Sequence, residues 1–267
     1  MAVVEALTAF MEDPDALKPN PIHSTSVAQD YGYRAALVGG VTVYGWTVAP
    51  VVDVLGDTWL DTGWAELAFK RPVYPGDDLE IRVSDDGQLR VTRDGEPCVT
   101  GQVGLGDAPW RDELTESGRT APEPSPDPLP PLNPVTVPVG EDLAARRVPL
   151  SEEESIALCR DRQRERMACF YGEKPRVHPS WIAGQPIHWL HHSYAFGPSI
   201  HARSRIQHLA PAYAGGDFVV TGRCTRAFEQ REHQYIECDT ALRDDTGTRY
   251  ALVRHTSVYQ VANKRGR

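Results

Sequence analysis

The chain carries one order of elements twice, and this internal repeat limits its fold more than any other feature. In each half a proline-containing turn comes before an apolar segment of helical length, and strands of alternating polarity follow. A glycine-aspartate pair precedes a strand in both halves, at Gly76-Asp77 and at Gly216-Asp217. The repeated order predicts an internal duplication, in which two similar units make up the 267 residues.

The first half is expected to contain one long buried helix and four strands. The apolar run at residues 41–55 is long for a strand, and Gly56-Asp57 supplies a helix stop, so we expect a helix. Residues 1–15 also show some helical spacing. Alternation with a period of two then predicts an antiparallel meander, with strands at residues 64–73, 79–83, 89–92 and 98–105.

The second half follows the same plan behind an additional helix. Ser151 and the three glutamates after it are typical of a capped helix start, and this helix is expected to run to about Tyr171. The turn His178-Pro179-Ser180-Trp181 then introduces the second long helix, at residues 182–196. Strands are predicted at residues 200–209, 218–228, 234–242 and 250–261.

A proline-rich segment separates the halves. Eight prolines fall between Pro122 and Pro138, and few large apolar residues accompany them. Such a segment buries too little surface to offset the entropy lost on ordering, so it is interpreted as a linker. We therefore expect an N-terminal unit at residues 1–106, a linker at 107–150 and a C-terminal unit at 151–267.

The composition narrows the class of protein. A net charge of −9 argues against a general nucleic-acid binder. No apolar run reaches the roughly 18 residues that a membrane helix needs, and the start of the chain lacks the pattern of a secretory signal. The cysteines are odd in number and widely spaced, which is typical of reduced thiols. A cytoplasmic protein is expected.

One helix followed by a meander that wraps it resembles the hot-dog fold, and the duplication resembles a double hot-dog. The residues resemble those of the MaoC-like acyl hydratase/dehydratase family, whose motif is Asp-x-Asn-Pro-x-His followed by an alanine. Asn20, Pro21, His23 and Ala28 match that motif, and residues 71–77 match the strand-to-turn signature of the family. The resemblance implies an α+β fold with two wrapped helices and one extended antiparallel sheet.

The resemblance also implies a set of site residues. His23 would transfer protons and Asn20 would position it, while backbone N–H groups near Gly40 and Val41 would bind the thioester oxygen. Three further candidates for substrate binding are Tyr44, His178 and Trp181. Because Trp181 stands where the second copy would place its histidine, the pocket is expected between the halves, with its polar end in the first half.

The catalytic aspartate of the family is missing here. It should stand two residues before Asn20, where this chain has Lys18, and the turn at His178 has no carboxylate nearby to replace it. The chain therefore keeps the imidazole of the motif without the carboxylate that accompanies it.

The remaining histidines are interpreted as structural or surface residues. His188, His191 and His192 have helical spacing, but no carboxylate of a known metal motif accompanies them. His201, His208, His233 and His255 lie in or between predicted strands. No metal and no cofactor is expected.

Three hypotheses for the function follow. The first is a hydratase or dehydratase, a carbon-oxygen lyase, that acts on an acyl thioester or a related intermediate through His23. The second is a non-catalytic acyl-binding or partner subunit, which Lys18 and Trp181 favour. The third and weakest is a hot-dog thioesterase, for which Asp53 is the only acid well inside the first long helix. The substrate would be carried by coenzyme A or a carrier protein, and the chain could form a homodimer.

Overall fold

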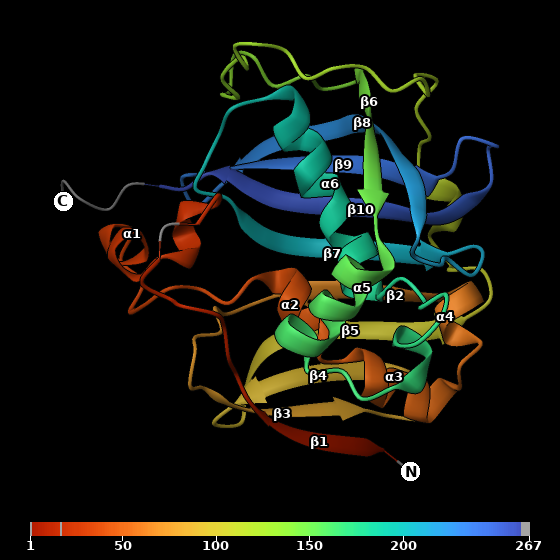
Figure 1. The fold of residues 1–267 in the computed structure, drawn as a ribbon. Coiled ribbons are helices and arrows are strands. Elements are labelled where there is room, and N and C mark those ends of the chain that lie inside the picture. Colours follow the sequence, from red (N-terminus) through yellow and green to blue (C-terminus); the bar gives the residue numbers. More distant parts are fainter. Residues whose placement is uncertain (1, 17, 263–267) are drawn as a thin grey trace.

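The strands of the chain form a single antiparallel sheet that runs through both halves. A computed structural model describes residues 2–16 and 18–262. Within them the sheet has ten strands in the order β1-β3-β4-β5-β2-β7-β10-β9-β8-β6, and helices cover one face of it (Figure 1). The strands are β1 (Val3–Thr8), β2 (Gly63–Phe69), β3 (Asp78–Val83), β4 (Gln88–Arg93), β5 (Glu96–Leu105), β6 (Asp142–Leu150), β7 (Ile200–His208), β8 (Gly216–Gln230), β9 (His233–Arg243) and β10 (Arg249–Gln260).

The strand order confirms the duplication. Read outward from the centre, the first half gives β2, β5, β4, β3 and β1, and the second gives β7, β10, β9, β8 and β6. Each strand thus has a counterpart in the other half. The halves join where β2 pairs with β7 in antiparallel register, for example Ala65 with Ile206. This junction removes two sheet edges that would otherwise be open to pairing with other chains.

The helices confirm two wrapped units. They are η1 (Pro21–His23), α1 (Thr25–Asp30), α2 (Gly40–Gly45), α3 (Val48–Leu55), α4 (Trp59–Thr62), η2 (Arg111–Glu113), α5 (Glu152–Ala157), η3 (Leu158–Gln163), η4 (Ala168–Phe170) and α6 (Pro179–Ser193). In the first half α3 packs against β1, β3 and β5, and in the second α6 packs against β6, β8, β9 and β10. α2 also packs against α6, so the central helices of the two halves meet.

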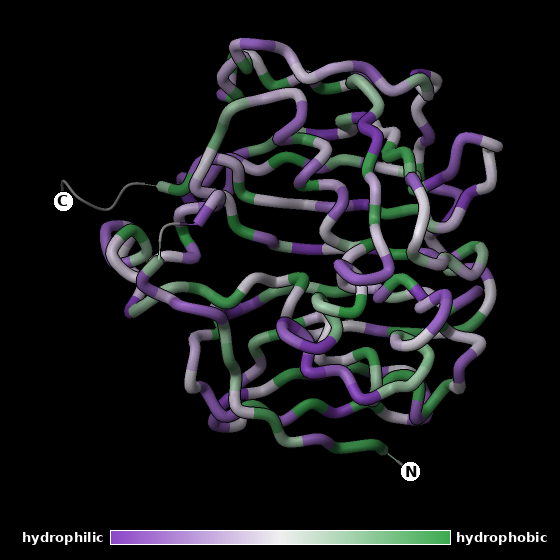
Figure 2. The backbone as a smooth tube through the Cα atoms, viewed as in Figure 1, coloured by the Kyte–Doolittle hydropathy of each residue, from purple (hydrophilic) through white to green (hydrophobic). Residues whose placement is uncertain are grey.

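Alternating hydropathy explains why the strands form. Along β3 exposed and buried residues alternate, with Leu79, Ile81 and Val83 turned inward. Figure 2 shows similar alternation of hydrophobic and hydrophilic residues along strands of both halves. The inward side chains form one main core that includes residues of both units. None of the described helices is long and apolar enough to cross a membrane.

Two predicted helices differ in the structure. The helix expected at 41–55 is divided into α2 and α3, because Pro50 in the first turn of α3 has no N–H to continue an unbroken ladder. At the break the Thr47 hydroxyl donates to the Tyr44 carbonyl oxygen at 2.7 Å. The helix expected from Ser151 to Tyr171 ends much earlier, since Arg164 has a positive φ of 49° after the π-helical turn η3.

Both edge strands of the sheet were missed by the sequence prediction. The first residues form β1, not a helix, and alternate residues of this strand are buried further than their neighbours. The end of the segment expected as a linker, residues 107–150, forms β6, which pairs with β8. The proline-rich part of that segment lies ahead of β6 and passes the C-terminal end of α6. There the Leu132 N–H donates to the Ala195 carbonyl oxygen at 3.0 Å.

Candidate active site

A cavity of about 230 Å³ lies where the two halves of the chain meet. The first half contributes the turn at His23, the start of α2 and the end of β2, and the second half contributes the start of β7 and part of β10. No carboxylate is among the described residues that line it. The lining residues are Asn20, Ile22, His23, Tyr33, Leu37, Val38, Gly39, Gly40, Val41, Val43, Phe69, Lys70, Arg71, Pro72, Val73, Val99, Ile187, Ser199, Ile200, His201, His255 and Ser257.

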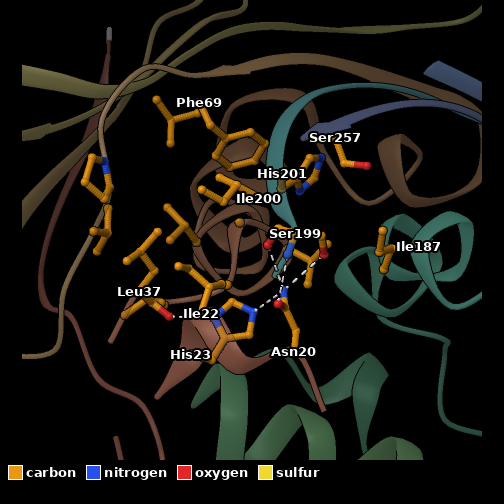
Figure 3. A pocket seen from close by; sticks show the side chains of 18 of the residues that line it. Asn20, Ile22, His23, Leu37, Phe69, Ile187, Ser199, Ile200, His201 and Ser257 are labelled. Carbon is orange, nitrogen blue, oxygen red and sulfur yellow. Dashed lines mark hydrogen bonds between the residues drawn. The ribbon is translucent and has the colours of Figure 1, made fainter. Parts of the chain in front are cut away.

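The imidazole of His23 is held in one tautomer. His23 ends the short turn η1, in which Pro21 takes the first helical position. Its Nδ1 lies 2.7 Å from the carbonyl oxygen of Leu37 (Figure 3). Because a carbonyl oxygen can only accept, Nδ1 carries the proton and Nε2 is unprotonated, with a lone pair that can accept. The unprotonated nitrogen is therefore the one available as a base.

The surroundings of His23 also favour its neutral form. Burial lowers the pKa of His23, and the positive charge of Lys18 lowers it further, against the opposing effect of the hydrogen bond to Leu37. Lys18 does not line the cavity. Its ammonium group donates to the Glu12 carbonyl oxygen at 2.9 Å. Lys18 thus acts on the imidazole through its charge.

Asn20 ties the histidine turn to the other half of the chain. Its side-chain nitrogen donates to the Ser199 carbonyl oxygen at 2.8 Å, and its side-chain oxygen accepts from the Ser199 N–H at 3.1 Å. The same nitrogen lies 3.3 Å from Nε2 of His23 (Figure 3). A reciprocal pair of hydrogen bonds to backbone groups fixes the amide plane. Asn20 therefore positions the imidazole against the start of β7.

The glycine pair at the start of α2 allows close approach. A β-carbon on Gly39 would lie 3.7 Å from Cε1 of His23, and one on Gly40 would lie 2.8 Å from Nδ1 of His201. A side chain at Gly40 would therefore collide with His201, whereas a β-carbon at Gly39 would make only ordinary contact with His23. The first N–H groups of a helix have no partner within the helix, so those of Gly40 and Val41 remain as donors at this end.

The second half supplies a polar wall that sequence analysis missed. His201 and His255 were interpreted as structural, yet both line the cavity together with Ser257. The ring centroids of His201 and His255 lie 4.3 Å apart, and the ring centroid of Phe69 also lies 4.3 Å from that of His201. The alternation of β10 could have indicated this, since it places His255 and Ser257 on the same face as Val253.

Three predicted substrate-binding residues lie outside the cavity. Tyr44 is buried in the main core. His178 is fully buried at the N-terminus of α6, where its Nδ1 accepts a hydrogen bond from the Ser180 N–H at 3.2 Å. Trp181 lines a separate, wider depression with Arg146, Gln185 and other residues. The second copy of the turn therefore begins a helix, whereas the first copy presents its histidine to the cavity.

The remaining histidines occupy varied surroundings. His191 stacks on Phe196 with ring centroids 3.9 Å apart, and His192 Nε2 lies 2.9 Å from the Glu123 carbonyl oxygen. His208 is buried beside Trp59. Within the part of the chain that the structure describes, no three histidine, cysteine or acidic residues are placed to hold a metal ion.

Comparison with known proteins identifies the fold. No protein-family model matches the chain, and no curated protein matches it. A conserved hypothetical protein from Mycobacterium tuberculosis with a double hot-dog fold has a TM-score of 0.60 at 13% identity, over 88% of this chain and 86% of that one. A candidate MaoC domain dehydratase from Chloroflexus aurantiacus has a TM-score of 0.58 at 15% identity, over 98% and 95%.

A third similar structure carries a different functional name. A candidate thioesterase from Novosphingobium aromaticivorans has a TM-score of 0.52 at 14% identity, over 84% of this chain and 88% of that one. These likenesses confirm that the chain has the double hot-dog fold, which it shares with MaoC-like dehydratases. Because one fold hosts several activities, the function must be argued from the residues of the cavity.

Proposed function

We propose that the chain is a carbon-oxygen lyase that adds water to, or removes it from, an acyl thioester, with His23 as the proton-transfer residue. The observation that carries this proposal is the fixed tautomer of His23, whose side chain lines the cavity. A neutral imidazole with an unprotonated Nε2 is a suitable base near neutral pH. Hydration and dehydration are the two directions of one reaction and share one transition state, so the proposal includes both.

The proposed reaction uses one imidazole for both proton transfers. In the dehydration direction, Nε2 of His23 removes a proton from the α-carbon, and the electron pair of that bond forms the carbon-carbon double bond. The bond from the β-carbon to its hydroxyl then breaks, and the imidazolium returns the proton to the leaving hydroxide, which departs as water. Hydration is the reverse. Because one imidazole serves both the α- and the β-carbon, the α-proton and the β-hydroxyl must lie on the same face of the substrate.

Two further features would support this chemistry. The N–H groups of Gly40 and Val41 are proposed to bind the thioester oxygen, where negative charge develops as the α-proton leaves. Asn20 is proposed to keep Nε2 of His23 aimed at the substrate, because its amide is fixed by Ser199. His178, Trp181 and Tyr44 are not proposed to contact the reacting atoms, since they lie outside the cavity.

The carrier of the acyl group would be coenzyme A or a carrier protein, and we place the reaction in the cytoplasm. The five cysteines are free thiols, as expected in a reducing compartment. We also propose that the chain assembles into a homodimer.

The binding-subunit hypothesis is the second candidate, and Lys18 favours it. With lysine in place of the aspartate of the motif, the cavity could hold an acyl chain without turning it over. The thioesterase hypothesis is weaker still, because Asp53 is exposed on α3 and does not line the cavity.

Turnover of trans-2-enoyl thioesters separates the three hypotheses. Crotonyl and longer enoyl thioesters are incubated with the whole chain, and loss of the conjugated double bond and release of free thiol are followed in parallel. A lyase removes the double bond without releasing thiol, and a thioesterase releases thiol. Tight binding of the thioesters without either change would support the binding subunit and overturn the lyase.

A further inference from the structure

Four buried polar atoms on one wall of the cavity have no hydrogen-bond partner within the described residues. They are Nδ1 of His201, Nδ1 and Nε2 of His255 and Oγ of Ser257. His255 is 4% exposed and Ser257 is 1% exposed. All three residues line the cavity, and in Figure 3 His201 and Ser257 lie across it from His23 and Asn20. The second half therefore places a concentrated set of unpaired donors and acceptors in the wall of this space.

The physical cost of leaving these atoms unpaired points to their use. A buried polar group without a partner costs about 1–3 kcal/mol. A plain alkyl chain against this wall would leave all four unpaired, because it carries no donor or acceptor. An oxygen atom within hydrogen-bond distance of any of them could supply the missing partner.

The charge state of the wall selects the kind of oxygen. Burial lowers the pKa of His201 and of His255, so both rings are neutral near pH 7. A neutral imidazole offers one donor and one acceptor, and the Ser257 hydroxyl offers both. This combination matches a hydroxyl or carbonyl oxygen. A carboxylate beside two neutral rings is unfavourable in a buried site, because the two cations that line the cavity, Lys70 and Arg71, are exposed residues.

We infer that His201, His255 and Ser257 bind a hydroxyl or keto oxygen carried by the acyl chain, across the cavity from the carbon on which His23 acts. The inference rests on the proposed function, because it assumes that an acyl thioester occupies this cavity. The substrate would thus be an oxygenated acyl chain. His201 is positioned for this by Ser204, whose hydroxyl lies 2.6 Å from its Nε2 and leaves Nδ1 as the free nitrogen.

Binding of matched thioesters tests this inference. Hexanoyl- and octanoyl-pantetheine are compared with counterparts that carry a hydroxyl or keto group at carbon 5, 6 or 7, by calorimetry on the whole chain. These saturated probes are not dehydrated at the α and β carbons, so affinity is measured alone. At least one oxygenated probe should bind on the order of 10-fold more tightly than its plain counterpart, the gain expected for one or two satisfied hydrogen bonds.

Two pairs of variants locate the effect. Ser257→Ala and His255→Leu should reduce the preference to about one, and binding of the plain probe should stay level or improve. Ser193→Ala and His208→Leu are the controls, because each removes an unpaired buried polar atom outside the cavity. These two should keep the preference of the wild type, and thermal melting of every variant reports whether it is folded.

The outcomes distinguish the inference from the proposed function. Equal affinity of the wild type for plain and oxygenated probes overturns the inference, even if enoyl thioesters are hydrated. A clear oxygen preference without any turnover overturns the lyase and leaves the oxygen site in place. A preference that the two control variants lose as fully as Ser257→Ala also contradicts the inference, since it would not arise at this wall.

Discussion

The stability of the fold should fall steeply between pH 7.5 and pH 5, because buried histidines must stay neutral in it. Burial lowers the pKa of His208 and of His255 from 6.5 to about 4 in each case. In the unfolded chain both would take up a proton below about pH 6.5. Their contribution to stability is therefore complete above that pH and is lost as the pH falls toward 4.

The magnitude follows from the two pKa values. At pH 5 the unfolded histidine is almost fully protonated, whereas the folded one is mostly neutral. With 1.36 kcal/mol per pKa unit, each histidine loses about 2 kcal/mol of its contribution between pH 7.5 and pH 5. The two together lose about 4 kcal/mol, a large fraction of the ~5–15 kcal/mol that stabilises a typical domain.

Urea unfolding at pH 7.5 and at pH 5 measures this loss directly. His208→Gln removes one titrating group, so the difference between the two pH values should shrink by about 2 kcal/mol, whatever the substitution does to stability at pH 7.5. A wild-type free energy of unfolding that stays level between the two pH values would refute the reasoning. So would an undiminished pH dependence in His208→Gln.

Three further predictions concern the site, its second copy and the linker. The rate constant kcat/KM should increase as the pH rises through a pKa below 6.5, because His23 must be neutral to act as a base, and Lys18→Met should move this increase to higher pH; an increase that Lys18→Met leaves in place would argue against the charge effect. His178→Ala should lower the free energy of unfolding by about 2–4 kcal/mol, since it removes the cap of α6 and leaves Oε2 of the buried Glu165 carboxylate, 3.5 Å away, without the imidazole; chemical denaturation should show partial recovery on adding Glu165→Gln. Deleting residues 124–128 should leave cooperative thermal unfolding intact, because loop-closure entropy depends weakly on length, and a broad, non-cooperative transition would contradict this.

Much of the fold could be predicted because its strands follow simple alternation. The four strands predicted in each half are present, and the repeated order of elements became the symmetric strand order of the sheet. The edge strands β1 and β6 were harder to predict from the sequence. β6 carries two arginines and Pro149, which suit an edge strand but disguise it in a sequence. Its pairing with β8 is a long-range contact that no local pattern records.

The site, like the fold, could be predicted only in part. The turn at Asn20 and His23 could be found because its residues are close together and match a known motif. The opposite wall could not, because it forms only when the halves associate. Asn20 meets Ser199, and Gly40 meets His201, across more than half of the chain. The sequence also suggested His178 as a substrate-binding residue, whereas in the structure it is buried and caps α6.

The most direct test of the proposed role of His23 is the hydration rate of an enoyl thioester by His23→Ala, with His178→Asn as the matched variant. His23→Ala should reduce kcat/KM by about 10²–10⁴-fold, the range for a positioned acid-base group. His178→Asn keeps a residue that can cap α6, and it should cost less than about 10-fold because His178 lies outside the cavity. Undiminished turnover in His23→Ala, or equal losses in the two folded variants, would contradict the role assigned to His23.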